Sequence, residues 1–560
     1  MTIMGKDDNG KTKNSGYTIL SQEELAEGKT TEIVGLEITG MVRNLSPYLW
    51  TRSFCDITRL VVKSNQLTKV PSEITNLKRL THLDLSHNML RSLPPEIGDL
   101  VTLKELLLRH NYLRLLPYEL GKLFNLQVLN LDENPMAPEV SQLYSDPRNV
   151  QKLLSFMLDK LPVPEPQRTA PQRQWKSLQE VDQSAVSYIF TIMTYNILAE
   201  NYATRSQYGY CPSWALSWSY RKDLILKEII RNQADIICLQ EVVTDEYNQF
   251  FLPELSKEGY KGIFEAKSRA RTMNEEDRRF VDGCAIFYKS DKFEVESREL
   301  IEFNMLARQI VETARQNGST NKASDDVINR VMTKDNIGVV AVLKFKNPPD
   351  NINSASDELK SNYLNQIMIS NVHIHWDPEY CDVKLMQILL FLTELRRKIS
   401  DHIPLVLTGD FNSLPSSGVI QFLLDSRIPF SHPDFKEIDY KHFFDEISTS
   451  GDDSSKITHP HNLSSAYPLD KEGCFTNYTY DFKGIIDYIF YPQDYMKPLG
   501  ILDTVDSQWF RDNKILGCPH PLVPSDHYLL LTELQMFLGN QPAPNTSPPN
   551  SSKNKNSITN

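Results

Sequence analysis

One stretch of the chain repeats itself every 23 residues, and this constrains its fold more than any other feature. Asparagine recurs at that interval, at Asn65, Asn88, Asn111 and Asn134. Apolar pairs recur in the same register, for example Leu83 with Leu85 and then Leu106 with Leu108. A unit of this length cannot bury its own apolar face, so such units must stack into an array that is capped at both ends.

The unit LDLSHNMLRSLPPEIGDLVTL has the pattern of a leucine-rich repeat, in which the L-x-L leucines point inward from a short strand. We predict a leucine-rich-repeat solenoid over 17–160, with caps at 17–56 and 137–160. Residues 57–138 carry ten Lys/Arg and eight Asp/Glu, a net charge of +2. A nearly neutral array suits docking of a protein better than clamping of RNA, and a passive spacer is the alternative interpretation.

Composition limits the remaining possibilities. With 560 residues the chain is too long for one core, and its net charge of −12 argues against an unselective grip on nucleic acid. The seven cysteines are scattered, which is typical of reduced thiols. We see neither an apolar leader at the N-terminus nor an apolar run of roughly 20 residues, so we predict a cytoplasmic protein with no membrane contact.

The order of predicted elements divides the chain further. We predict disorder over 1–16, a Pro-rich linker over 161–185, an α/β domain over 186–537 and a disordered tail over 538–560. Within the α/β domain, apolar strands alternate with amphipathic helices such as 219–234 and 382–399, a pattern that favours sheets layered with helices. We interpret 307–335, 347–362 and 446–470 as polar loop insertions.

Six polar residues stand at the ends of predicted strands. They are Asn196 in TYNILAE, Glu241 in CLQEVV, Asp410 and Asn412 in LTGDFNS, and Asp526 and His527 in PSDH. Hydrolysis of a phosphodiester needs a cation, a group that orients water and a group that stabilises developing charge. Carboxylate and amide oxygens are ligands that Mg²⁺ prefers, so Glu241 and Asn196 are candidate metal ligands.

The other members of this set are candidates for the reaction itself. Asp410 and Asn412 are two residues apart and therefore share one side of an extended strand end, where they can hold one water and one phosphate oxygen. His527 needs a carboxylate to orient its ring, and Asp487 in GIIDYIF is our choice over the adjacent Asp526. Taken singly, each residue is more often structural; their joint appearance in this order indicates a site.

The ordered set TYNILA, LQEV, NVHIHWDP, GDFNS, GIIDYIF and SDH resembles the endonuclease/exonuclease/phosphatase superfamily. A leucine-rich array placed before such a domain resembles one branch of it, the carbon-catabolite-repressor-type poly(A) deadenylases. The resemblance covers roughly residues 20–537. It implies a four-layer α/β sandwich and a Mg²⁺-dependent exoribonuclease that shortens poly(A) tails from the 3′ end and releases 5′-AMP.

The resemblance also implies roles for individual residues. Glu241 is expected to bind Mg²⁺ with support from Asn196 and with Asp526 close by, and whether one or two ions bind stays open. Asp410, Asn412, Asp487, His527 and His373 are expected to be catalytic, whereas His375 is expected to be structural. Pro378 and Phe482 match positions that sandwich the terminal adenine. A phosphate contact is also expected from Asn412. Apart from the resemblance, the alternate spacing of Lys267, Arg269 and Arg271 in KSRARTM predicts that they line an RNA entry, with Arg269 contacting substrate, and a solvated loop is the alternative interpretation.

Partners follow from the same resemblance. The array is expected to dock a DEDD-type deadenylase subunit and, through it, the scaffold of an mRNA-deadenylation complex, in the cytoplasm with the nucleus as a second location. Two alternatives stay open at this point. One is another phosphodiesterase or phosphatase activity of the superfamily, acting on abasic DNA, lipids, inositol phosphates or dinucleotides. The other is an inactive scaffold that uses the array alone.

Overall fold

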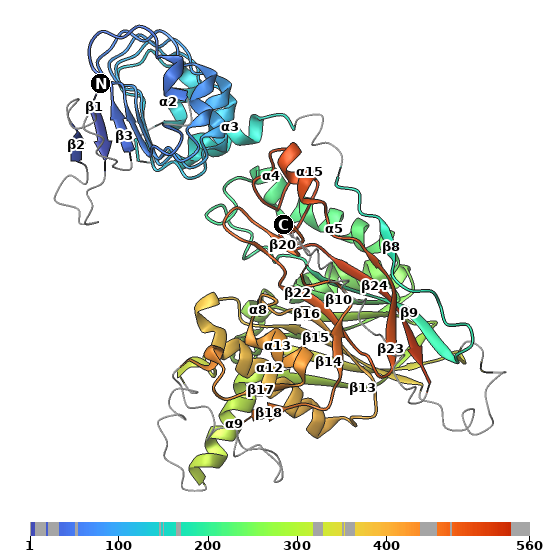
Figure 1. The fold of residues 1–560 in the computed structure, drawn as a ribbon. Helices are drawn as coiled ribbons and strands as arrows, with labels where there is room; N and C mark the ends of the chain where they lie inside the picture. The colour runs from blue at the N-terminus through green and yellow to red at the C-terminus, as the bar shows by residue number, and fades with distance from the viewer. Residues whose placement is uncertain are drawn as a thin grey trace, which may run out of the picture. The chain divides into compact units, whose positions relative to one another are not determined.

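The computed structural model describes residues 2–5, 18–20, 33–50, 54–144, 147–148, 150–163, 170–316, 329–349, 352, 365–436, 456–470 and 473–538 (Figure 1). The chain forms two compact units. The first contains Met1–Thr169 with two later segments, Ala203–Tyr220 and Pro519–Leu522. The second contains Ala170–Tyr202, Arg221–Cys518 and Val523–Asn560.

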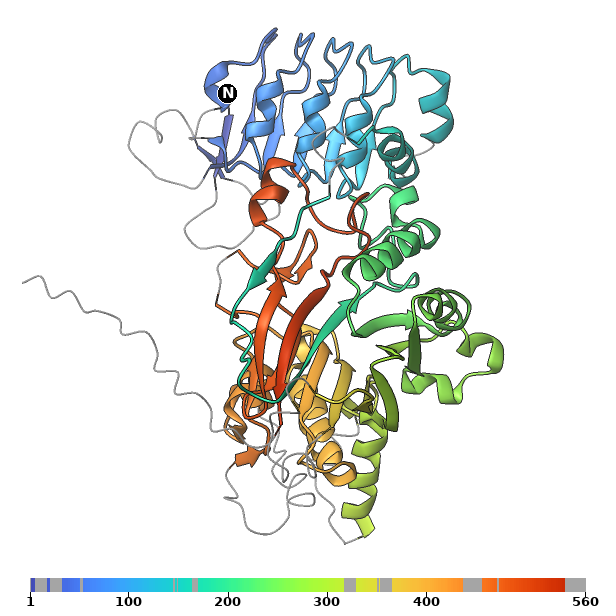
Figure 2. The same ribbon diagram turned by 90° about the vertical axis from the view of Figure 1, so that its right-hand side faces the viewer.

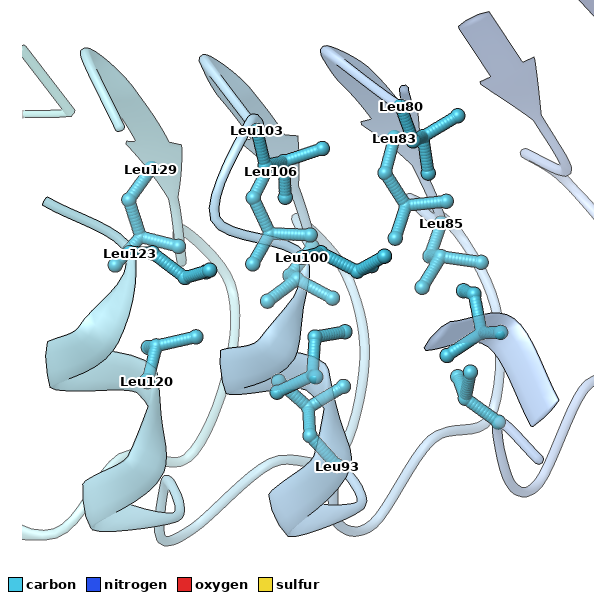
Figure 3. Close-up of a cluster of buried hydrophobic side chains, with 14 of the residues drawn as sticks. Leu80, Leu83, Leu85, Leu93, Leu100, Leu103, Leu106, Leu120, Leu123 and Leu129 are labelled. Carbon is cyan, nitrogen blue, oxygen red and sulfur yellow. The ribbon is translucent and has the colours of Figure 1, made fainter. Parts of the chain in front are cut away.

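The first unit is built on the 23-residue repeat. Four short parallel strands lie side by side in it: β4 (Arg59–Val61), β5 (His82–Asp84), β6 (Glu105–Leu107) and β7 (Val128–Asn130). On the opposite side, each LPxE-type stretch forms a 3-10 helix, as at Pro95–Asp99 (Figure 2). Leucines from both sides fill the space between them, and Leu83, Leu106 and Leu129 are fully buried (Figure 3). The predicted leucine-rich-repeat solenoid is therefore present.

The recurrent asparagine holds neighbouring repeats together. The Asn111 amide nitrogen donates to Leu85 O at 3.0 Å and to Leu108 O at 2.9 Å, and its Oδ1 accepts from Leu90 N at 3.0 Å. The side chain therefore satisfies backbone groups of its own repeat and of the repeat before it. Asn88 makes the corresponding bonds one repeat earlier.

The array is flanked at both ends by other elements. At the N-terminal side, β3 (Ile33–Glu37) pairs in parallel with β4, and β1 (Thr2–Gly5) pairs antiparallel with both β3 and β2 (Thr18–Leu20). The expectation of disorder is thus wrong for Thr2–Gly5, and the rest of 1–16 lies outside the described residues. At the other end, the helices α2 (Pro138–Leu143) and α3 (Gln151–Lys160) follow the last repeat.

Besides two small two-stranded sheets, the described residues of the second unit form two large sheets. The first has the strand order β11-β12-β10-β9-β24-β23-β8. Its strands span Tyr260–Ala266, Asp282–Lys289, Ile236–Val243, Ser187–Asn196, Leu530–Phe537, Met496–Leu502 and Trp175–Ser177, in that order. The second sheet has the order β13-β14-β15-β16-β22-β19. Its strands span Phe293–Glu302, Ile337–Phe345, Gln366–His373, Leu405–Asp410, Asp487–Pro492 and Leu463–Ser465.

Helices cover the outer faces of this pair of sheets. The helices α9 (Phe303–Gln316), α12 (Cys381–Lys398) and α13 (Gly418–Asp425) share one buried core with the second sheet. On the first sheet, α7 (Leu252–Lys257) packs against β11, and α5 (Trp218–Asn232) contributes buried residues such as Ile229. A separate core lies between the two sheets. The expected layered α/β sandwich is confirmed. Among the described residues, no helix combines the length and apolar character needed to cross a membrane.

The inward-facing residues between the sheets change character along the strands. The first layer is apolar and includes Ile192, Ile236, Ile369 and Val406. Two residues further along each strand, or two residues back on the antiparallel β22, side chains face the same way again. The next layer is more polar, with Thr194, Asn371 and Thr408 beside Cys238 and Ile489, all buried. The layer beyond it contains Asn196, Gln240, His373, Asp410 and Asp487, so the strands carry these polar residues to one edge of the sandwich.

Three sequence predictions need correction. Residues 303–316 were expected to lie partly in a polar insertion, but they form α9, because Phe303, Ala307 and Val311 recur at helical spacing and are buried. The predicted linker over 161–185 contains strand β8, which pairs with β23. The predicted insertion over 446–470 contains β18 (Lys456–Thr458) and β19. Much of 347–362, and all of 539–560 of the expected tail, lie outside the described residues.

Candidate active site

Strand register brings the predicted residues together at one edge of the two sheets. In the second sheet, Asp410 is the register partner of both His373 and Asp487. In the first sheet, Asn196 at the end of β9 lies beside Gln240, the neighbour of Glu241. The sequence separations are large, so only the pairing of strands makes these residues neighbours.

Glu241 reaches the site through an irregularity in β10. The pairing of β10 with β12 shifts between Gln240 and Val242, and Glu241 has a left-handed φ of 59°. Such a conformation costs a non-glycine residue about 1–2 kcal/mol, and strain of this kind concentrates at functional sites. As a result the Glu241 carboxylate accepts from the Asn196 amide at 3.1 Å and from the backbone N–H of Ala199 at 2.8 Å.

Asn196 connects the two sheets at this edge. Its amide nitrogen donates to Glu241 Oε1 on the first sheet and, at 2.9 Å, to Asp410 Oδ2 on the second. Its Oδ1 accepts from the backbone N–H of Leu198 at 3.1 Å. The separation of the two sheets therefore determines whether one amide can contact both carboxylates.

Asp410 is held by hydrogen bonds and lies among other charges. Its Oδ1 accepts from the backbone N–H of Asn412 at 2.8 Å, while the Asn412 amide donates to Ile374 O at 3.0 Å. Burial, reinforced by the neighbouring Asp487 carboxylate, raises the pKa of Asp410 to about 7. A carboxyl group with such a pKa can accept and release a proton near neutrality.

Asp487 and His527 form a buried pair. Both oxygens of Asp487 lie within hydrogen-bond distance of His527 Nδ1, at 3.0 and 2.9 Å, as expected for this pair. Burial by itself would lower the pKa of His527, but Asp487, followed by Asp526 and Asp410, outweighs it and raises the pKa well above its usual value. The imidazole is therefore cationic, and its Nε2 lies 3.7 Å from Asp410 Oδ2.

The other predicted residues of the edge lie around this pair. His373 Nε2 is 3.7 Å from the same Asp410 oxygen, and its Nδ1 is buried without a hydrogen-bond partner in the described structure. Burial lowers the pKa of His373 well below its usual value, so this ring is neutral. Asp526 accepts from the Asn477 amide at 3.2 Å. His375 is buried beyond the end of β15 and packs against the Tyr380 ring.

A buried cluster of charged side chains that the sequence did not predict lies near Glu241. Lys267 Nζ contacts Asp282 Oδ2 at 2.7 Å, and Arg269 contacts Asp282 Oδ1 at 2.6 Å. Burial opposes charge on Asp282, but Lys267 and Arg269 hold its pKa well below the usual range. Asp282 also accepts from the Tyr202 hydroxyl at 2.9 Å. Asp282 begins β12, and no motif in the sequence marked it.

These contacts bear on the basic residues of KSRARTM. Arg269 pairs with Asp335 as well as with Asp282, and Arg271 pairs with Glu302 at 2.6 Å. The guanidinium of Arg269 is thus engaged by two carboxylates within the protein. Its expected contact with substrate stays a prediction, and the structure adds a different role, which is to neutralise buried Asp282.

The predicted stacking residues lie at the surface. Phe482 is partly exposed, and Pro378 begins a 3-10 turn that Asp377 caps by accepting from Glu379 N at 2.9 Å. The Phe482 ring passes so close to Gly484 that a Cβ added there would lie 2.7 Å from Phe482 Cζ and 3.0 Å from Leu414 Cδ2. Phe482 therefore packs beside Leu414, two residues beyond Asn412.

Two groups of donor atoms at this edge are candidates for binding a divalent cation, and only one of them suits it. One atom each from Asp410, Asp487 and His527 lie within 4.8 Å of one another, the one such group among the described residues. Because His527 is cationic and already holds Asp487, this group is poorly suited to ligate a metal. The predicted set of Glu241, Asn196 and Asp526 offers oxygens of the type that Mg²⁺ prefers. The contacts of Glu241 are to neutral donors, and burial raises the pKa of its carboxyl, so a cation there would compensate its charge.

Comparison with known families agrees with this fold. Residues 193–527 match the Endonuclease/Exonuclease/phosphatase family, and residues 56–113 match the Leucine rich repeat family. The chain belongs to the endonuclease/exonuclease/phosphatase family and carries a leucine-rich-repeat array ahead of the family domain.

Curated relatives resemble the chain over nearly its whole length. It is 47% identical over 536 residues to CCR4-NOT transcription complex subunit 6-like-B of Xenopus laevis, covering 93% of this chain and 94% of that protein. It is 40% identical over 563 residues to the CCR4-Not complex 3'-5'-exoribonuclease subunit Ccr4 of Schizosaccharomyces pombe, covering 91% of this chain and 76% of that protein. The resemblance to the carbon-catabolite-repressor-type branch is thus confirmed.

Among solved structures, the crystal structure of ANGEL2, a 2',3'-cyclic phosphatase, is 25% identical to the chain. The superposition covers 66% of this chain and 99% of that one, with a TM-score of 0.49.

Proposed function

We propose that the chain is a Mg²⁺-dependent 3′→5′ exoribonuclease that shortens poly(A) tails and releases 5′-AMP. The observation that carries this proposal is the convergence of Asn196, Glu241, Asp410 and the Asp487–His527 pair on one edge of the sandwich. Relatives that carry the exoribonuclease name, and that this chain matches over most of its length, support the choice of RNA as substrate.

In this proposal each residue has a chemical task. Glu241 and Asn196, with Asp526 close by, would hold Mg²⁺, which when bound neutralises phosphate charge and charge that develops in the reaction. Asp410 accepts the proton of the attacking water, for which its raised pKa is suited. Asn412 orients that water and a phosphate oxygen.

The two histidines complete the charge arrangement. Cationic His527, oriented by Asp487, stabilises negative charge on the transferring phosphoryl group. Neutral His373 donates a hydrogen bond to a phosphate oxygen. Water attacks phosphorus and gives its proton to Asp410, the bond to the 3′-oxygen of the preceding nucleoside breaks, and that oxygen takes a proton from solvent and leaves as a hydroxyl. The products are a 5′-monophosphate and an RNA that is one residue shorter.

Selectivity for adenine would come from stacking. We propose that the terminal base inserts between Pro378 and Phe482, both of which present apolar surface at the rim. Stacking on such surfaces is worth roughly 1–3 kcal/mol per base. A slot of fixed width would favour a purine over the smaller uracil ring.

The array suggests the context in which the enzyme works. We propose that it docks a DEDD-type deadenylase subunit on its strand face, and through it joins the scaffold of an mRNA-deadenylation complex in the cytoplasm, with the nucleus as a second location. Relatives named as subunits of the CCR4-NOT complex support this. Charge reversal on the strand face should abolish capture of the partner while the isolated nuclease rate stays unchanged; retained capture would contradict this surface.

A comparison of homopolymers tests the activity. Purified protein with Mg²⁺ should remove residues one at a time from A20 and should act slowly on U20, and chelation of Mg²⁺ should stop both reactions. Equal degradation of A20 and U20 would refute the poly(A) selectivity. Robust cleavage of abasic duplex DNA with no action on A20 would instead favour another activity of the superfamily. No hydrolysis of any of these substrates would favour an inactive scaffold.

A further inference from the structure

A tryptophan that no part of the proposed mechanism uses stands exposed beside the candidate site. Trp376 follows β15 by three residues, and 69% of its surface is exposed. That is the largest exposed fraction among the large hydrophobic side chains of the second unit in the described ranges. An indole in this position offers a large, flat apolar face on which a ligand can stack.

The backbone that carries Trp376 is tied down on both sides. Lys384 Nζ donates to Trp376 O at 3.2 Å and to Asn412 O at 2.6 Å. Before it, the His375 N–H donates to the buried Gln387 side chain at 3.0 Å. After it, Asp377 caps the turn that begins at Pro378. The indole is therefore presented by a fixed loop, which lowers the entropy that a ligand must overcome on binding.

The same lysine places Trp376 relative to the proposed chemistry. Because one ammonium group contacts the carbonyls of both Trp376 and Asn412, the two backbones lie side by side. Asn412 is the residue proposed to hold a phosphate oxygen. Trp376 is also two residues before Pro378, which is proposed to contact the terminal base. A base that rests on Trp376 thus belongs to a nucleotide next to the terminal one.

Cations accompany this loop. Lys334 Nζ lies 4.2 Å from the centre of the Tyr380 ring, which belongs to the turn that follows Trp376. Lys436 donates to Glu379 O in the same turn. In single-stranded nucleic-acid sites, aromatic platforms for bases alternate with cations that attract the backbone. Lys334 and Lys436 supply such cations around Trp376, although the same turn also carries Asp377 and Glu379.

We propose that Trp376 is a second nucleobase-stacking site, which takes the base immediately 5′ of the terminal residue. This inference rests on the proposed function and adds to it the recognition of the leaving nucleoside. Its 3′-oxygen is the group released when the phosphodiester bond breaks, so stacking of its base aligns that oxygen with the bond to be broken. Two adjacent stacked bases would make the enzyme read a dinucleotide end rather than a single residue.

Substrates that lack one base test the proposal. We would measure kcat/KM for an oligo(A) of eight residues, intact or with an abasic residue at the penultimate or the third position from the 3′ end. The wild-type protein should cleave the terminal residue of the penultimate-abasic substrate about 10- to 100-fold more slowly than that of the intact one. The third-position substrate should be cleaved at nearly the intact rate.

Substitution of Trp376, combined with removal of one base from the substrate, forms a double-mutant cycle. Trp376→Ala should lower kcat/KM on intact RNA by the same 10- to 100-fold and should show no further loss on the penultimate-abasic substrate, because both changes remove one contact. Trp376→Phe should retain most of the rate. Trp175→Ala, which removes a half-exposed indole on β8, is the matched control and should leave all three rates unchanged.

Separate readouts distinguish failure of this inference from failure of the proposed function. The p-nitrophenyl ester of 5′-AMP has no second base, so Trp376→Ala should hydrolyse it as fast as wild type does. Equal losses on all substrates, or additive losses in the cycle, would overturn the stacking site. If the effect of Trp376→Ala were non-additive with loss of the third base instead, the assignment of the penultimate base to Trp376 would also be overturned. Failure of the wild-type protein to hydrolyse intact RNA would refute the proposed function itself.

Discussion

The polar layer beneath the candidate site offers a sharp test of how the two sheets are held in register. Asn371 in β15 is completely buried between them. Its Oδ1 accepts from Gln240 of the first sheet at 2.7 Å, and its amide nitrogen donates to Leu239 O and Ala285 O, each at 2.9 Å. One side chain of the second sheet thus makes three hydrogen bonds to two strands of the first. Replacing it with leucine, Asn371→Leu, keeps its approximate volume and removes all three.

The size of the effect follows from these contacts. A buried hydrogen bond contributes about 1 kcal/mol net, and a polar group left without a partner costs about 1–3 kcal/mol. Loss of three bonds, partly offset by the apolar leucine, should lower the free energy of unfolding by about 3 kcal/mol. For a unit of this size that corresponds to roughly 4 °C in melting temperature.

Catalysis should suffer beyond the loss of stability. Asn196 on the first sheet contacts Asp410 on the second at 2.9 Å, so a relative shift of the sheets breaks the link within the site. A misplacement of about 1 Å can cost roughly 100-fold in rate. We therefore expect kcat on oligo(A) to fall by at least about tenfold, with KM changed less than about threefold, at temperatures well below the melting transition.

The assay pairs thermal unfolding with steady-state kinetics, and Val406→Ala is the matched control. Val406 is fully buried in the same core between the sheets but makes no polar link across it. Its truncation should cost about 2 kcal/mol of stability and leave kcat within about twofold. If Asn371→Leu is destabilised but keeps wild-type kcat, the polar layer does not position the site. If both variants lose kcat equally, general loosening is the cause.

Three further outcomes are expected. Glu241→Gln keeps the shape of the side chain but removes its charge, so hydrolysis of A20 should fall by about 1000-fold and added Mg²⁺ should no longer raise the melting temperature; an unchanged Mg²⁺ response would exclude Glu241 as a ligand. Asp487→Asn should lower kcat by at least about 100-fold with little change in KM, because His527 loses the carboxylate that keeps it charged and oriented; a normal kcat would rule out that role. Asn111→Ala should destabilise the array by about 3 kcal/mol, measured by urea unfolding, while the A20 rate stays within about twofold.

Local patterns predicted much of the architecture. The 23-residue period defines the array because each asparagine meets the same backbone groups in every repeat. Apolar runs predicted the strands of the α/β domain, and β14 is buried along almost its whole length. The helix α9 was missed because its buried residues are few and stand among polar ones. Strand β8 was missed because all three of its residues are exposed, so hydrophobicity gave no signal.

The residues of the candidate site were likewise predictable only in part from the sequence. The spacing of Asp410 and Asn412 and the apolar strands before Asn196 and Glu241 were enough to propose phosphodiester chemistry. Lys267 with Asp282 could not be found, since their ion pair depends on the pairing of separate segments and leaves no pattern in the sequence. The bulge that turns Glu241 toward Asn196 could not be predicted either, because a left-handed φ at glutamate contradicts its local preference.

By itself, therefore, the sequence determined the repeat array, the succession of strands and helices, and the types of polar residue at the strand ends. These are properties of neighbours along the chain, expressed through periodicity and turn chemistry. Only the tertiary structure decided that Asn196 joins carboxylates of two sheets and that Lys384 places Trp376 beside Asn412. Such contacts depend on strand register and on the packing of one sheet on another, and both are set by the whole core rather than by any single segment.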